Sequence, residues 1–452
     1  MRQLQEIGTE VLCLDHHTLP DDYDMEKETP SNAIVINNQL SPNYPNKSLC
    51  GAGVVYKFCE VLDDVLGINL ANEFIDLAAL GEIADVMNRC DVETNYIIME
   101  GLRNIKNEGL IALIEAQSYS LKERAQYPYN GLTPIDIAFY IAPLINAIIR
   151  VGSLQEKETL FYCFTDPNKV VKSTKRGAKP EDTETASEQT ARVGANAKAR
   201  QNKIKERALD LIDFKIQKEN LNENNIIIVE LEEEDKIPQE MTGLIAMAVV
   251  SKYGKPCMIG RKNSLGNVQG SIRSDGNFAG LPSFKKFLEE SQLMNFVAGH
   301  DNSAGWGIKE DNLEELLEYA NKNLNDEDFS SSYLVDYVLD AHQNNVDLLY
   351  SLAEHPEYFG NHIDEVKLVI KNIPLENIME MGINKDSMKI SYNGVDYVRF
   401  KDLDFVGKIF ENRTKCLNIY GRVALNTWMG KTSIQCVISD YELSGDESKY
   451  DF

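Results

Sequence analysis

Val11-Leu12-Cys13-Leu14-Asp15-His16-His17 is the stretch that decides the fold. Its four apolar residues predict a short buried strand, and an Asp-His-His triplet follows at the carboxyl end of that strand. Open α/β sheets carry their sites at this end of their strands. A carboxylate beside neutral imidazoles suits Mn²⁺, Zn²⁺ or Fe²⁺ better than Ca²⁺. The stretch therefore predicts a metal site, although a histidine pair alone is weak support for one.

The surrounding sequence predicts an α/β domain. A second apolar strand covers residues 33–37, and helical spacing of apolar residues follows over 51–66, 74–86 and 135–149. Strands that alternate with helices are typical of a parallel sheet covered by helices.

Two charged residues stand out in this domain. Asp85 lies at the end of an apolar helix, where a carboxylate is costly unless it is paired or holds a metal; the alternative is a turn cap near Asn88. Arg150 ends the helix over 135–149, where the helix dipole alone also favours a cation.

A second α/β unit is predicted from about 225 to 323. It contains strands at 226–229 and 256–259, a small-residue helix at 243–250 and a further strand edge at 271–274. Residues 299–305, which include His300, are equally consistent with a plain turn and with a ligand-binding loop.

Between the two units, residues 172–199 contain little but Lys, Thr, Glu, Ser, Gly and Ala. This composition predicts a flexible surface loop that enters a charged helix at about 198–215. Because the charges are mixed, a solvated linker is favoured over a nucleic-acid-binding tail.

The last region, from about residue 364, predicts a small β-barrel because several segments alternate between apolar and polar residues. Residues 432–438 have the period-two pattern of a half-buried strand.

Composition narrows the class of protein. The formal charge of −25 argues against a protein that coats DNA electrostatically, but it leaves room for a local positive channel. The eight cysteines contain no CxxC pair, so zinc and redox motifs are not expected, and free thiols fit a reducing cytoplasm. Neither a signal peptide nor an apolar run long enough to cross a membrane is expected.

Taken together, the ordered motifs resemble the DHH phosphoesterase superfamily, and specifically the RecJ-type single-stranded-DNA exonucleases. The matching segments are residues 11–17, 30–37, 44–57, 79–87, 141–152, 271–274 and 299–305, so the resemblance covers nearly the whole chain. It implies an α/β fold with a DHH-type parallel sheet domain over 1–170, a flexible loop and connecting helix over 171–216, a DHH-associated domain over 217–325, a helical connector over 326–363 and an oligonucleotide-binding (OB-like) β-barrel over 364–447.

The resemblance also implies a mechanism, in which two divalent cations, Mn²⁺ or Mg²⁺, grip the scissile phosphate and activate water. His16 and Asp85 would be metal ligands, Asp15 would orient the site, and His17 would touch the phosphate or a ligand. The residues implied to hold DNA are Arg150, Ser271 and Arg273 for a 5′ phosphate, His300 near the cleft, and Tyr392, Tyr397 and Phe400 for stacking bases.

This sequence departs from the family pattern at its start and in one motif. The family's first two metal motifs lie upstream of the Asp-His-His strand, and this sequence starts too late to contain them. Ala298 replaces the first glycine of the family's Gly-Gly-His. We therefore expect a fragment or one half of a split gene, inactive alone and complemented by an N-terminal chain.

The resulting expectation is a metal-dependent 5′-to-3′ exonuclease on single-stranded DNA in repair, recombination or replication, cytoplasmic, without membrane contact, and able to work with a single-strand-binding protein. Two alternatives stay open: a non-catalytic single-stranded-DNA-binding scaffold, and a DHH phosphodiesterase on short oligonucleotides, although relatives of the second kind are typically shorter.

Overall fold

The computed structural model describes residues 4, 6–18, 29, 31–129, 131–330, 334–428 and 431–445. Residues 446 and 447 of the predicted barrel and residues 331–333 of the predicted connector lie outside this set. Contacts divide the chain into two compact units: unit 1 comprises 1–132 and 136–332, and unit 2 comprises 133–135 and 333–452.

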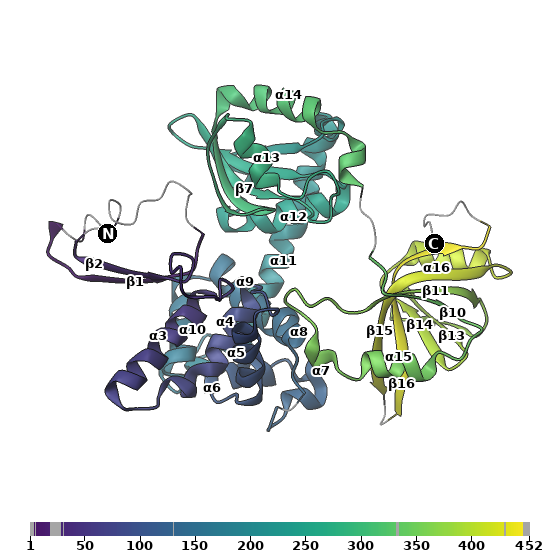
Figure 1. Cartoon of the computed structure of the whole chain (residues 1–452), viewed down its shortest axis with the longest axis horizontal. Coiled ribbons are helices and arrows are strands. Elements are labelled where there is room, and N and C mark those ends of the chain that lie inside the picture. Colours follow the sequence, from purple (N-terminus) through teal and green to yellow (C-terminus); the bar gives the residue numbers. More distant parts are fainter. Residues whose placement is uncertain are drawn as a thin grey trace. The chain divides into compact units, whose positions relative to one another are not determined.

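Unit 1 begins with the predicted strand, β1 (Val11–Asp15), which pairs in parallel with β2 (Ala33–Asn37). This pair is drawn in dark purple in Figure 1. The main helices that follow are α3 (Gly51–Leu66), α4 (Ile75–Ala84), α5 (Val92–Arg103), α6 (Glu108–Glu115), α9 (Ala142–Val151) and α10 (Leu154–Thr165). The expected helices over 51–66 and 74–86 are confirmed as α3 and α4, because their apolar residues meet in shared clusters.

The second α/β region of unit 1 surrounds a five-stranded sheet with the order β5-β6-β7-β9-β8. Its strands are β5 (Ile227–Leu231), β6 (Cys257–Lys262), β7 (Asn267–Arg273), β8 (Met294–His300) and β9 (Ser303–Lys309). Its helices are α12 (Thr242–Tyr253), α13 (Phe284–Glu290) and α14 (Leu313–Asn323). β5 and β6 are parallel, and their segments 227–229 and 257–259 are buried or half-buried, which is why these segments are apolar runs.

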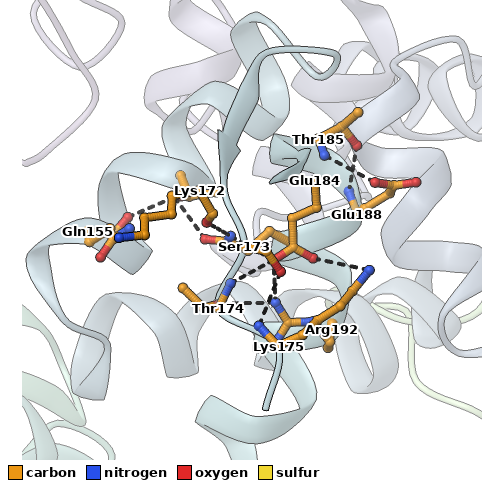
Figure 2. Close-up of polar contacts among 11 residues, drawn as sticks. Gln155, Lys172, Ser173, Thr174, Lys175, Glu184, Thr185, Glu188 and Arg192 are labelled. Carbon is orange, nitrogen blue, oxygen red and sulfur yellow. Dashed lines mark hydrogen bonds and ion pairs between the residues drawn. The ribbon is translucent and has the colours of Figure 1, made fainter. Parts of the chain in front are cut away.

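The predicted flexible loop over 172–199 is wrong. A hairpin of β3 (Val170–Lys172) and β4 (Thr183–Thr185) fills its first part, and the long helix α11 (Ala186–Lys218) begins directly afterwards. Thr185 and Glu188 form a capping box at the start of α11. Figure 2 shows the reason for this order: the buried Glu184 carboxylate accepts hydrogen bonds from the Thr174 backbone, from Gln189 and from Arg192. Polar composition therefore reflected a buried ion-pair network rather than flexibility.

Replacing Glu184 with alanine is expected to lower the free energy of unfolding by roughly 2–3 kcal/mol. The Glu184 side chain is 1% exposed and lies 2.6 Å from Arg192, so its loss leaves buried donors without an acceptor. Arg192 stays partly solvated, which keeps the loss near the lower end of the range for a broken buried pair. Chemical denaturation and amide hydrogen exchange over 173–185 measure the effect. The control Glu181→Ala removes an exposed carboxylate from the same hairpin; equal losses in both variants would contradict this role.

Unit 2 is built on a seven-stranded sheet with the order β10-β11-β15-β16-β14-β13-β12, drawn in green and yellow in Figure 1. Its strands are β10 (Tyr337–Asp340), β11 (Lys367–Pro374), β12 (Ile378–Met381), β13 (Ser387–Tyr392), β14 (Val395–Arg399), β15 (Cys416–Trp428) and β16 (Lys431–Leu443). Helices α15 (Val346–Ala353) and α16 (Leu403–Glu411) accompany them. The period-two prediction for 432–438 is confirmed, because Ile434, Cys436 and Ile438 alternate into the core.

The predicted helical connector over 326–363 differs from the structure at residues 337–340, whereas its second half contains helix α15. Strand β10 pairs in parallel with β11, with Tyr337 opposite Leu368, so it extends the sheet of unit 2. The β-region therefore starts near residue 337 rather than 364. The strand is short and offers too little alternation for a sequence pattern to reveal it.

One stretch, Pro134–Val151, is long and apolar enough to cross a membrane by length and composition, contrary to the sequence-based expectation. It is 44% buried within the protein and packs against α11, as a core helix does. We read it as part of the fold of unit 1.

Candidate active site

Four ligand-type side chains converge at the carboxyl end of β1. Nε2 of His16 lies 3.3 Å from a carboxylate oxygen of Asp85, and Nδ1 of His17 lies 2.7 Å from a carboxylate oxygen of Asp15. Ligand atoms of Asp15, His16 and His17 all lie within 4.8 Å of one another. An imidazole nitrogen that faces a carboxylate at this distance is a pair that one cation can bridge. Two carboxylates and two imidazoles form a donor set that fits Mn²⁺.

Strand pairing and one amide hold this cluster in place. Asp15 is opposite Asn37 in the β1–β2 register, and the buried Asn37 donates to the His17 carbonyl at 3.0 Å. The His16 ring packs over Gly51 at the start of α3. Asn37 was missed from sequence, although a polar residue that ends an apolar strand was a usable signal.

Asp85 is presented by a strained turn at the end of α4. The Met87 amide donates to the Glu82 carbonyl and the Val86 amide to the Ile83 carbonyl, the hydrogen bonds of a Schellman turn. Glycine usually occupies the left-handed position of this turn, but here Val86 does, with φ of 56°. A β-branched residue is rarely found in this conformation, and such strain concentrates at functional sites.

The protonation states suit metal binding. Burial lowers the pKa of His16 below its ordinary value even though Asp85 opposes the shift, so its imidazole is neutral near pH 7. Burial alone would raise the pKa of Asp15, but the hydrogen bond from the His17 ring, the backbone N–H groups of His16 and His17 and the charge of His17 together outweigh it, and the pKa is lowered. Neutral imidazole and ionised carboxylate are the forms that bind cations.

A second carboxylate, Glu82, lies one helical turn before Asp85 and is fully buried. It accepts the backbone N–H of Cys50 at the start of α3. A Cβ on Gly53 would lie 1.9 Å from its Oε1 atom, so glycine is required there. Burial raises the pKa of Glu82 to about 7.

This raised pKa predicts a pH-dependent stability. The folded state holds the Glu82 proton more tightly than the unfolded state, whose pKa is near 4.5. The free energy of unfolding should therefore fall as the pH rises from about 4.5 through about 7, by up to roughly 3 kcal/mol. Glu82→Gln should remove most of this fall, whereas Glu123→Gln, at an exposed position, should retain it. Denaturation at pH 5 and pH 8 measures both; a wild-type stability that does not fall would contradict the assignment.

Arg273 lies close enough to Arg150 for their charges to interact, and Ser271 lies two residues before Arg273 on the same strand; we call these three residues the anion pocket. Arg150 lies in the last turn of α9, while Ser271 and Arg273 lie on β7. The Ser271 hydroxyl is 2.9 Å from that of Thr242 in the first turn of α12. The Arg273 guanidinium packs against Gly243, where a Cβ would lie 2.5 Å from its Nη2 atom. Thr242 and Gly243 were missed because small residues at a helix start carry no distinctive pattern.

The two arginines of the pocket repel each other. Burial lowers the pKa of Arg273, and Arg150 lowers it further; burial also lowers the pKa of Arg150. Within the described part of the chain, neither guanidinium has an ion-pair partner. Partly buried cations without a carboxylate are typical of a site that receives an anion.

His300 is the last residue of β8, beside the hairpin turn to β9, and it is exposed. It is close enough to His16 to contribute to lowering the pKa of that residue. Residues 299–305 thus form a β-hairpin end rather than an irregular loop, and His300 approaches the metal-type cluster from the second α/β region.

The three predicted stacking residues lie in unit 2 and differ in exposure. Tyr397 is 2% exposed and belongs to the core, so its predicted stacking role is wrong. Tyr397 and Val395 lie on the same, buried face of β14. The sequence pattern alone did not show which face of this strand is buried. Tyr392 is half-buried with its hydroxyl 2.8 Å from His342, and Phe400 is 52% exposed.

The chain resembles known proteins in sequence and in fold. Residues 335–440 match the family model of the RecJ OB domain. The chain is 33% identical over 459 residues to a putative SPbeta prophage-derived single-strand DNA-specific exonuclease, YorK, of Bacillus subtilis, and the match covers 99% of the chain and 76% of YorK.

Two further matches concern RecJ itself. The chain is 26% identical over 455 residues to the single-stranded-DNA-specific exonuclease RecJ of Bacillus subtilis, and it spans 52% of that protein. The crystal structure of RecJ in complex with Mn²⁺ from Thermus thermophilus has the same fold, with a TM-score of 0.69 at 21% identity, over 98% of this chain and 59% of that one.

Proposed function

Because the chain belongs to the RecJ family of single-strand DNA-specific exonucleases, we propose that it acts as a divalent-metal-dependent exonuclease on single-stranded DNA and degrades the strand from its 5′ end. The observation that carries this proposal is the contact between His16 and Asp85, 3.3 Å apart in a cluster with Asp15 and His17. The predicted binding of Mn²⁺ or Mg²⁺ follows from this donor set.

Each residue of the cluster has a proposed role. His16 and Asp85 would hold the cation, and Asp15 would orient His17 through their 2.7 Å hydrogen bond. His17 is exposed, and because its Nδ1 atom faces Asp15, we propose that its Nε2 atom contacts a scissile phosphate. Bound divalent cations would lower the pKa of a water and stabilise the leaving oxygen.

The direction of degradation is proposed from the anion pocket. Arg150, Ser271 and Arg273 would hold a terminal 5′ phosphate, because guanidinium groups match phosphate oxygens bidentately. His300 would contact the strand between the pocket and the metal-type cluster. An enzyme that holds the 5′ end in this way shortens its substrate from that end.

Unit 2 is proposed to bind the rest of the strand. An OB domain binds single strands by stacking bases on exposed aromatic rings. With Tyr397 in the core, Phe400 and Tyr392 remain as candidates for stacking bases. Phe400 is the better one because it is exposed, whereas Tyr392 is half-buried. We also propose that a single-strand-binding protein works together with this chain. The eight free thiols fit a reducing cytoplasm, which we propose as its location.

We also propose a complementing polypeptide segment. Two dications carry four positive charges, and Asp15 and Asp85 supply only two negative ones. Parallel sheets are normally covered on both faces, yet Leu12 and Ile34, paired across β1 and β2, are 49% and 65% exposed. A segment that adds a strand and carboxylates here would cover this face and complete a two-ion site.

A polarity assay tests the proposed function. The protein, with and without the polypeptide encoded directly upstream, is given Mn²⁺ and single-stranded DNA labelled at either end. We expect a 5′ label to be released first, EDTA to stop the reaction, and duplex DNA to resist. Release of the 3′ label first would contradict the direction. DNA binding without cleavage in both preparations would favour a scaffold, and cleavage of dinucleotides alone would favour an oligonucleotide phosphodiesterase.

A further inference from the structure

We propose that Lys198 of α11 is a third phosphate-binding cation of the anion pocket and selects a terminal phosphomonoester over an internal phosphodiester. This inference rests on the proposed function and adds to it a residue in a segment where the sequence predicts only a flexible linker.

The packing of α11 against α9 brings Lys198 to the pocket. Ala147 and Ile148 of α9 share a buried cluster with Val193 and Ala197 of α11. Gly194 permits the close approach, since a Cβ there would lie 3.2 Å from the Leu144 Cβ atom. Lys198 directly follows Ala197, and Arg150 lies two residues beyond Ile148, so both cations belong to the two helices that form this contact, and they are close enough for their charges to interact.

Charge supports this assignment. Burial lowers the pKa of Lys198, and Arg150 lowers it further, followed by Lys205. Arg150 lowers the pKa of Arg273 as well, so it interacts with the cations on both sides. A chain with a net charge of −25 has many carboxylates available, yet in the described part of the chain Arg150, Lys198 and Arg273 have no carboxylate partner.

Neighbouring cations on α11 behave differently. Arg192 pairs with Glu184, Arg200 with Glu156 and Lys215 with Asp235. Lys203, Arg207 and Lys218 of the same helix also lack an ion pair among the described residues, but all three are exposed, so partial burial without an acidic partner is confined on α11 to Lys198 and its neighbour Lys205. Three partly buried cations repel one another, and a bound anion reduces this repulsion. The reduction is largest for the anion with the highest negative charge, so that anion should bind most tightly.

A 5′ phosphomonoester is that anion. It carries a charge of about −1.5 to −2 near pH 7, whereas each internal phosphodiester carries a single charge. The guanidinium groups of Arg150 and Arg273 can each donate two parallel hydrogen bonds to the oxygens of one phosphate. Lys198 adds a point charge whose benefit depends on the second negative charge.

The test measures binding, in EDTA, of a short oligothymidylate that carries either a 5′ phosphate or a 5′ hydroxyl. Lys198→Met should reduce the preference for the phosphorylated strand by about tenfold and lower the magnitude of the salt slope by about 0.7. Lys198→Arg should retain most of the preference. The matched control, Lys203→Met, removes an exposed cation from the same helix and should change neither quantity.

Thermal unfolding provides a second readout. Removal of one repelling cation should raise the melting temperature of Lys198→Met, and inorganic phosphate should stabilise the wild type more than this variant. A preference unchanged in Lys198→Met but lost in Arg273→Ala would overturn this inference and leave the proposed function intact. A wild type without any 5′-phosphate preference would overturn the inference together with the proposed polarity.

Discussion

Replacing Asp85 with asparagine, or His16 with alanine, is expected to reduce Mn²⁺-dependent cleavage of single-stranded DNA by more than about 100-fold when each variant is assayed together with the proposed complementing segment. Loss of groups that merely support metal ligands already costs roughly 10–100-fold, and these two residues are proposed as the ligands themselves. Their contact distance of 3.3 Å makes them dependent on one another, so the double variant should be no worse than either single one.

Binding of the strand separates this role from a structural one. Both variants should bind single-stranded DNA with nearly wild-type affinity at fixed salt, because the cations of the pocket and unit 2 are unchanged. Asp64→Asn, at an exposed position on α3, is the matched control and should cleave normally. Near-normal cleavage by either site variant would refute the metal assignment, and loss of folding in both would make the residues structural.

Replacing Arg273 with alanine should weaken binding of a 5′-phosphorylated strand by about 10–100-fold while affecting a 5′-hydroxyl strand much less. The loss corresponds to about 1.5–3 kcal/mol, the contribution of a charge-assisted hydrogen bond to phosphate. Arg273 is held against Gly243 and donates to the Ile272 carbonyl at 2.6 Å, so its guanidinium is already ordered before the anion arrives.

Arg103→Ala is the control for this measurement, since Arg103 is 69% exposed and lies 3.8 Å from Glu100. Equal losses on the two strand ends in Arg273→Ala would mean that the residue contributes general attraction rather than recognition of the terminal phosphate.

The sequence predicted those elements whose apolar spacing was strong. Helix α3 and the alternation of β16 were recognisable because burial imposes a period on each of them. Strand β1 was recognisable from its apolar run, although its residues are only half-buried and Leu12 is exposed. The Asp85 position was also recognisable, because a carboxylate at the end of an apolar helix is unusual. Family resemblance was needed to connect Asp85 with His16, since no local pattern links residues so far apart.

Other features could not be predicted because they depend on tertiary contacts. The polar segment before α11 is ordered by the buried Glu184, which looks like any other acidic residue in sequence. From the sequence, Tyr397 is equally consistent with a surface residue that stacks bases and with a core residue. Only the structure shows that it lies on the buried face of β14. Lys198 and Gly243 acquire meaning only where α9, α11 and α12 approach Arg273.

The central claim is that His16 and Asp85 hold a divalent cation, and direct titration with Mn²⁺ tests it most simply. Electron paramagnetic resonance measures the free Mn²⁺ that remains as the protein is added, without any need for turnover. We expect the wild type and Asp64→Asn to bind Mn²⁺ equally. We expect His16→Ala and Asp85→Asn each to weaken Mn²⁺ binding by at least about tenfold. Equal Mn²⁺ binding by all four proteins would contradict the central claim.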